Sequence, residues 1–139
     1  MNNIKFRAYL KITNEMVNVK SINFENSTIK YNNPSTGITM CAGFENIELM
    51  QAINLTDKNG TEIYEGDIID IHETVNGQNL FVITFGKLKV LPTYLCGEEY
   101  EYNILDLLDW YTRPDEVSIE VIGNIYESHD LLWKYIRQS

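Results

Sequence analysis

The sequence predicts a mainly β fold, a small barrel with two short helices, and two observations carry that prediction. Short segments rich in β-branched and aromatic residues recur along the chain, separated by turns rich in Asn and Gly. The pair Asn76-Gly77 is the strongest hairpin signal, because both residues tolerate the positive φ of a tight two-residue turn. Short strands joined in this way favour a small barrel over alternating strands and helices.

Four strands are expected in the first half of the chain, at residues 4–10, 16–24, 28–31 and 47–53. A turn at residues 13–15 joins the first two strands, and the composition of residues 32–37 (NNPSTG) is typical of a loop. The alternation of residues 16–24 is imperfect, because Val17 and Val19 lie out of step with Ile22 and Phe24.

The second half is expected to begin with turns at residues 58–60 and 64–67. Strands at 68–73 and 80–85 then pair through the Asn76-Gly77 turn, and a further strand covers 87–95. Apolar residues at helical spacing predict a short helix over 103–111 with Asn103 as its N-cap. A strand over 117–122 follows, and Ser128 is the expected N-cap of a final helix.

The length and composition are those of one soluble globular domain. The chain has 139 residues, of which 44% are hydrophobic and 22% charged. We expect a single domain over 1–139, with a β-rich portion at 1–48 and a barrel portion at 49–139. No apolar run approaches the ~20 residues of a membrane span, and the N-terminus does not resemble a signal peptide. A cytoplasmic location is therefore expected.

The net charge of −9 is unevenly distributed along the chain. Residues 1–60 contain six basic and five acidic side chains, whereas residues 61–139 contain five and fifteen. Binding to phosphate backbones requires a basic face, so this distribution argues against it. A protein partner or a second copy of the chain is the expected partner, and no membrane contact is expected.

No catalytic or cofactor-binding arrangement is recognisable, so we expect neither an enzyme nor a cofactor. Cys41 and Cys96 lack the spacing of a zinc site or a disulfide framework, and we expect both as buried or half-buried thiols. His72 and His129 also lack metal-ligand spacing. A run of carboxylates crosses the central turn at Glu62, Glu65, Asp67, Asp70 and Glu73. Its spacing does not match a calcium loop, and we interpret it as solvated turn and edge charge.

Residues 94–116 mix acidic and aromatic side chains. Aromatic residues are enriched at protein interfaces, which makes this segment the candidate interaction surface. Its members are Glu98, Glu99, Tyr100, Glu101, Tyr102, Asp106, Asp109 and Trp110. The alternative is a barrel connection whose aromatic residues fill the core while the acids face water.

Three segments carry a family signal: residues 5–9 (KFRAY), the central stretch 49–69 (LMQAINLTDKNGTEIYEGDII) and residues 120–127 (EVIGNIYE). In this order they resemble the YopX-like family of uncharacterised phage and prophage proteins. The resemblance implies an SH3-like barrel with an additional β-rich portion, and it carries over no activity and no catalytic residue. Residues 87–116 depart from the family pattern. The turn residues expected to determine the fold are Asn59, Gly60, Gly66, Asp67, Asn76, Gly77 and Gly123.

These observations predict a phage or prophage accessory protein, non-enzymatic, that acts through protein contacts or self-assembly. The alternative is a small-barrel module that binds nucleic acid. Its basic side chains would be Lys5, Arg7, Lys11, Lys20 and Lys30.

Overall fold

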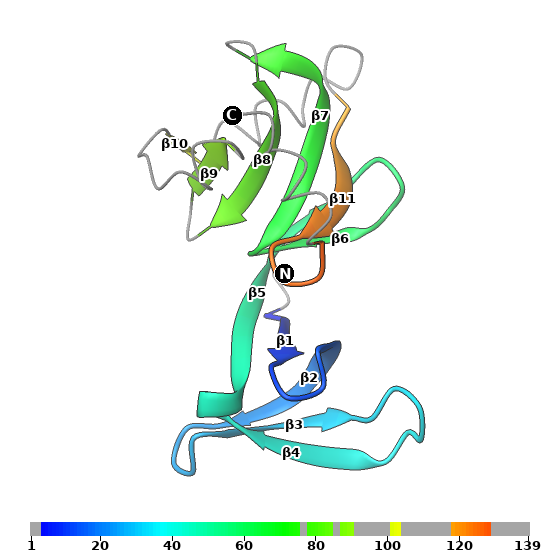
Figure 1. Ribbon diagram of the computed structural model, residues 1–139, viewed down its shortest axis with the longest axis vertical. Helices are drawn as coiled ribbons and strands as arrows, with labels where there is room; N and C mark the ends of the chain where they lie inside the picture. The colour runs from blue at the N-terminus through cyan, green and yellow to red at the C-terminus, as the bar shows by residue number, and fades with distance from the viewer. Residues whose placement is uncertain (1–3, 76–77, 85–86, 91–100, 104–117, 129–139) are drawn as a thin grey trace. The chain divides into compact units, whose positions relative to one another are not determined.

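The fold is described from a computed structural model, which describes residues 4–75, 78–84, 87–90, 101–103 and 118–128 (Figure 1). The predicted β-rich class is confirmed, since the described elements are eleven strands and one 3₁₀ helix. The chain divides into two compact units, residues 1–52 and 53–139, and the division falls inside one strand, β5. Among the described residues, no helix is long and apolar enough to cross a membrane.

The first unit contains four complete strands and most of a fifth. They are β1 (Phe6–Leu10), β2 (Glu15–Asn23), β3 (Thr28–Asn32), β4 (Thr39–Gly43) and β5 (Ile47–Thr56), with the 3₁₀ helix η1 (Phe44–Asn46) before β5. They form an antiparallel sheet in the order β4-β3-β2-β1-β5, and β6 (Glu62–Tyr64) continues this sheet beside β5. Strand β4 was not predicted from the sequence.

A bulge in β2 explains the imperfect alternation of its sequence. Val19 pairs with Tyr31 and Ser21 pairs with Lys30, so Lys20 has no counterpart in β3. The extra residue reverses which side chains face inward. Val17 and Ile22 therefore pack against the same apolar cluster although their spacing is odd. The buried members of this cluster are Ala8, Leu10, Val17, Ile29, Tyr31 and Ile47.

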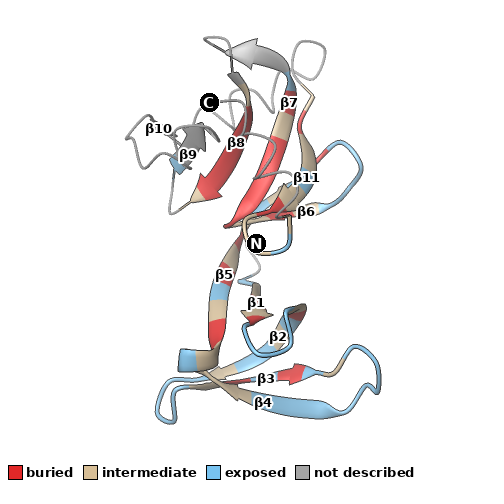
Figure 2. Ribbon diagram, viewed as in Figure 1, coloured by how far each residue is buried: buried red, intermediate tan, exposed pale blue. Residues whose placement is uncertain are grey.

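The second unit holds an antiparallel sheet in the order β10-β9-β8-β7-β11. Its strands are β7 (Asp67–Val75), β8 (Gln78–Thr84), β9 (Lys87–Val90), β10 (Glu101–Asn103) and β11 (Glu120–Asn124). The predicted pairing of β7 with β8 is confirmed, with Ile69 opposite Phe81. Both faces of this pair are buried, as the red segments of Figure 2 show. One face joins the cluster of Ile63, Ile69, Ile71, Phe81, Ile83 and Ile119.

A large irregularity interrupts the pairing of β7 with β8. Asp70 pairs with Leu80 and Val75 pairs with Gln78, so four residues of β7 lie opposite the single residue Asn79. His72 lies inside this bulge and has a φ of 54°, in the left-handed region that glycine adopts at lower cost than residues with a side chain. The bulge therefore turns His72 away from the direction it would take in a regular strand.

Several predicted elements differ from the structure or lie outside its described part. Asn103 ends β10, and the rest of the helix predicted at 103–111 lies outside the described residues. The same holds for residues 129–139 of the predicted final helix. The strand predicted at 117–122 runs from Glu120 to Asn124. Gly123 was expected in a turn, but it lies within β11, opposite Ile68 and beside a bulge, because the turn begins only at Ile125.

Candidate functional site

The buried carboxylate of Asp57 organises the turn at residues 57–61. Its Oδ1 accepts the backbone N–H groups of Asn59 at 2.8 Å and of Thr61 at 2.9 Å. Its Oδ2 accepts the N–H of Val121 at 2.9 Å, from a residue 64 positions later in the chain. Gly60 has a φ of 82°, which lets the turn close with an N–H bond to the carbonyl of Asp57 at 3.0 Å. One carboxylate thus joins the central segment to β11.

This environment favours the ionised form of Asp57. Burial raises the pKa of its carboxyl, but N–H groups of Val121, Thr61 and Asn59 and the charge of Lys58 have the larger effect. The pKa of Asp57 consequently lies below its ordinary value.

The same turn covers the outer edge of β11, the last strand of the second sheet. The N–H of Lys58 donates to the carbonyl of Ile119 at 2.9 Å, and the N–H of Val121 points to Asp57. The side-chain amide of Asn59 donates to Glu120 at 3.3 Å. The turn therefore pairs two backbone groups at this edge, the C=O of Ile119 and the N–H of Val121.

A second turn, at residues 64–67, also uses its carboxylate for the backbone. Asp67 is 1% exposed, and its Oδ2 accepts the N–H of Tyr64 at 2.8 Å. The carbonyl of Gly66 accepts the N–H of Ile125 at 2.9 Å, so the segment after β11 docks on this turn. The interpretation of the carboxylate run as solvated charge is therefore wrong for Asp67, because its oxygen has a backbone partner inside the protein.

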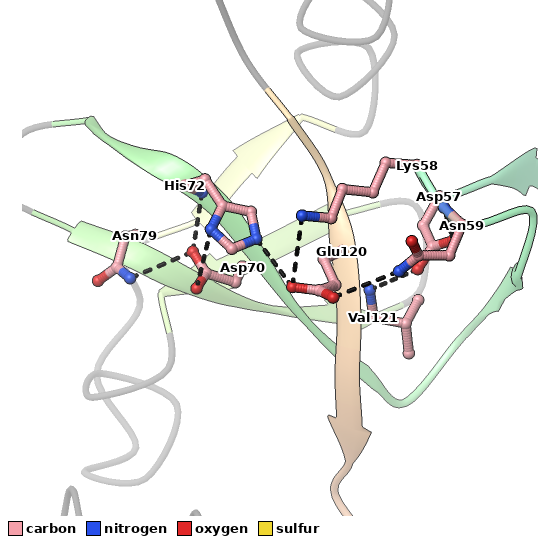
Figure 3. Close-up of polar contacts among 8 residues, drawn as sticks. All are labelled: Asp57, Lys58, Asn59, Asp70, His72, Asn79, Glu120 and Val121. Carbon is pink, nitrogen blue, oxygen red and sulfur yellow. Dashed lines mark hydrogen bonds and ion pairs between the residues drawn. The ribbon is translucent and has the colours of Figure 1, made fainter.

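A polar cluster on the second unit, which we name the His72 cluster, connects three segments of the chain (Figure 3). It comprises Lys58, Asn59, Asp70, His72, Asn79 and Glu120. The imidazole Nε2 of His72 lies 2.9 Å from Oε1 of Glu120, and Nδ1 lies 3.7 Å from Asp70. Asp70 and Glu120 are directly opposite each other on β7 and β11.

Two acids placed opposite each other on neighbouring strands repel, and donors of the cluster offset this repulsion. Asn79 donates to Oδ1 of Asp70 at 3.2 Å, and the backbone N–H of His72 donates to the same oxygen at 2.8 Å. Lys58 lies 3.8 Å from Glu120, but its side chain is 43% exposed, so this ion pair contributes about 1 kcal/mol at most.

The contacts of the His72 cluster link β7, β11 and the Asp57 turn. The Nε2 of His72 is occupied by Glu120, and the 3.7 Å separation at Nδ1 is longer than a hydrogen bond. Across the described residues, no group of three or more His, Cys, Asp or Glu side chains has an arrangement that could hold a metal ion. Sequence reasoning missed this cluster because Glu120 lies 48 residues from His72.

The outer edge of β4 is the second candidate site, and it differs from the covered edge of β11. β4 is the first strand of its sheet, and Thr39, Met40 and Cys41 are exposed, as its pale-blue ribbon in Figure 2 shows. Cys41 was expected to be at least half-buried, and this is wrong for a physical reason. Cys41 pairs with Lys30 on the face of the sheet opposite the buried Ile29 and Tyr31.

The hydrogen bonds that flank β4 show which of its backbone groups point outward. Asn33 donates to the carbonyl of Ile38 at 2.8 Å, and Phe44 donates to the carbonyl of Ser27 at 2.9 Å. Hydrogen-bonded pairs alternate along an antiparallel ladder. The backbone groups of Met40 and Ala42 therefore also point toward β3, like those of Ile38 and Phe44. The N–H and C=O groups of the alternate residues point away from β3. They belong to Thr39, Cys41 and Gly43.

Most of the candidate interaction surface predicted at 94–116 lies outside the described residues. Glu101 and Tyr102 are the exceptions, and they lie in β10 opposite Lys89 and Leu88. The backbone of the other members, Glu98 to Tyr100 and Asp106 to Trp110, is not described. The same holds for the predicted hairpin turn Asn76-Gly77, for Cys96 and for His129.

We predict that Asp57→Asn lowers the free energy of unfolding of the second unit by about 2–3 kcal/mol. An amide can replace only one carboxylate oxygen, so one buried N–H loses its acceptor and faces another donor. Chemical denaturation followed by tryptophan fluorescence measures the change, because Trp110 and Trp133 both lie in residues 53–139. Glu25→Gln, at an exposed turn of the first unit, is the control. A loss below about 0.5 kcal/mol would contradict the role of Asp57.

The contribution of Asp57 is expected to depend on pH in one direction. Because the folded pKa is lower than the unfolded value of about 3.9, the unfolded chain binds more protons in acid. The contribution is complete above that value and disappears as pH falls through the folded pKa. The stability difference between wild type and Asp57→Asn should therefore shrink below about pH 4. If the stability difference between the two proteins stays constant or grows in acid, ionisation of Asp57 does not contribute to stability.

At His72 we predict that His72→Gly is more stable than His72→Ala by about 1 kcal/mol. Both variants lose the contact with Glu120, but only glycine removes the strain of the positive φ. The matched control is Asn18, an exposed residue of β2 that is not among those with positive φ, where alanine should be the more stable replacement. Thermal unfolding of the four variants measures both differences. If the same replacement, glycine or alanine, gives the more stable variant at both positions, the backbone at His72 is not strained.

The YopX protein family matches the chain over residues 5–133, which includes the Asp57 turn, the Gly66 turn and β11. A similar solved structure is that of protein EF1440 from Enterococcus faecalis, with 25% identity, a TM-score of 0.55, and coverage of 95% of this chain and 99% of that chain. No curated protein matches. The match spans nearly the whole chain, and the chain belongs to the YopX protein family.

Proposed function

We propose that this protein is a non-enzymatic accessory protein of a phage or prophage, and that it acts through protein–protein contacts made at the outer edge of β4. The observation that carries the proposal is the contrast between two sheet edges. The chain covers the edge of β11 with the Asp57 turn, whereas the edge of β4 presents three residues with outward backbone groups. An exposed edge of this kind pairs readily with another strand.

The composition of β4 supports the same proposal. Residues 31–44 contain no charged side chain, and β4 itself (TMCAG) contains no proline. Charged side chains, proline and bulges are the usual means by which proteins prevent pairing at an edge. The strand that precedes β4 in the sheet does have a charge, Lys30, but its side chain lies on the face of the sheet and leaves the edge clear.

The alternative function, nucleic-acid binding, is less well supported by the basic side chains of the first unit. Lys11 lies 3.2 Å from Glu48 and also donates to the carbonyl of Glu45 at 3.4 Å, so one of the five expected cations is paired with an acid. An electrophoretic shift assay at about 50 mM salt tests this alternative, because electrostatic affinity for nucleic acid is greatest at low salt.

Three finer expectations belong to the same proposal. We propose a cytoplasmic location, an SH3-like character for the barrel portion at residues 49–139, and a second contact surface in the acidic and aromatic segment 94–116. The uneven charge and the aromatic content of the second half support the last of these.

We predict that Thr39→Pro abolishes the protein contacts of the purified chain, whereas Thr39→Val preserves them. Proline removes the outward N–H of Thr39 without removing a bond to β3, and both variants lose the side-chain bond to Asn32. Light scattering of the purified protein and affinity capture from infected host cells measure the contacts. Identical masses and identical captured proteins for the two variants would contradict the proposal.

A further inference from the structure

The outward residues of β4 have a spacing that suits pairing with an identical strand. They are Thr39, Cys41 and Gly43, two positions apart along the strand, with Cys41 in the middle. In an antiparallel pair of two β4 strands, Cys41 can lie opposite Cys41 of the other copy, and Thr39 then lies opposite Gly43. Every outward N–H and C=O group of both strands gains a partner in this register. If the register shifts by two residues, one of these three residues lies beyond the end of the other strand and loses its partner.

We propose that β4 pairs with β4 of a second copy of this chain, antiparallel and about a two-fold axis at Cys41. This inference rests on the proposed function, since it names the partner of the same edge. A two-fold contact of this type joins the same surface of both copies and closes the assembly at a dimer.

The apolar side chains of the edge fit the same register. Ile38 and Met40 are 61% and 40% exposed, and they lie on the face of β4 that is turned toward the core residue Tyr31. In the proposed register Met40 lies opposite Ala42 of the second copy, and Ile38 lies opposite Phe44. Both exposed side chains therefore meet apolar partners, and Phe44 is already packed against the core cluster of its own unit.

Charge also favours a second copy at this place. Two copies with a net charge of −9 repel each other, so contact is least costly where the chain has no charge, and residues 31–44 are such a segment. Two charges lie near the proposed axis: Lys30, opposite Cys41 on β3, and Glu45, whose carboxylate lies against Gly43 at the end of β4. The two Lys30 side chains would be separated by three strand spacings, about 14 Å, beyond the Debye length at physiological salt.

The contact is small, which determines how it should be measured. β4 has five residues, so the interface is at the low end of the sizes seen for specific complexes. We therefore expect a dimer that dissociates on dilution, and the association is best measured by analytical ultracentrifugation over a wide concentration range, from about 10 μM to 1 mM.

The experiment uses charge exchange at the one position that meets itself across the axis. Cys41→Lys and Cys41→Asp should each be monomeric where wild type is dimeric, because like charges face each other. An equimolar mixture of the two variants should restore the dimer, because opposite charges then face each other. The control variant is Thr39→Lys, whose side chain faces Gly43 of the second copy, so no like charges meet and the dimer should persist.

Circular dichroism confirms that each variant is folded before its mass is interpreted, and Cys41→Ser, which should remain dimeric, controls for loss of the thiol. Two results would overturn the inference: a wild-type chain that is monomeric at 1 mM, or a mixture of the two charged variants that stays monomeric. If either occurs while Thr39→Pro still abolishes a contact with another protein, the edge binds a different partner. If Thr39→Pro also changes nothing, the proposed function fails as well.

Discussion

The second unit depends on one interaction, the acceptance of three backbone N–H groups by the buried carboxylate of Asp57. Two of these bonds close a local turn, and the third fixes β11 from far along the chain. A buried charge is stable only when it is well bonded, so this carboxylate requires the turn and the strand together. The lowered pKa of Asp57 is the electrostatic consequence of the same geometry.

This arrangement gives the recognisable motif a structural role. Asp57, Asp67 and Asn124 are the buried polar residues of the described part of the chain, and the oxygens of all three accept backbone N–H groups of neighbouring turns. Side chains that hold their own backbone are not available for a substrate. We therefore look for function at a place that these bonds leave open, and the edge of β4 is one such place.

The sequence predicted those elements whose physical cause is local. Alternating apolar residues identified β1, β3, β7 and β8, and Asn-Gly turn chemistry identified the pairing of β7 with β8. It missed β4, because an edge strand of small uncharged residues needs no apolar alternation. It also missed the bulges at Lys20 and His72, which depend on the partner strand. Asp67 was expected as a fold-determining turn residue, and its bond to the N–H of Tyr64 agrees with that, but its burial was not predicted.

Amide hydrogen exchange tests the central claim, that the family motif is a scaffold fixed by Asp57, most directly. The N–H groups of Asn59, Thr61 and Val121 should exchange slowly, close to the rates of the buried strand β7. The N–H groups of Asn26 and Ser35 are the reference, because they also donate to side-chain oxygens but lie in exposed turns. If Val121 exchanges as fast as these exposed amides, the carboxylate does not hold β11, and the account is wrong.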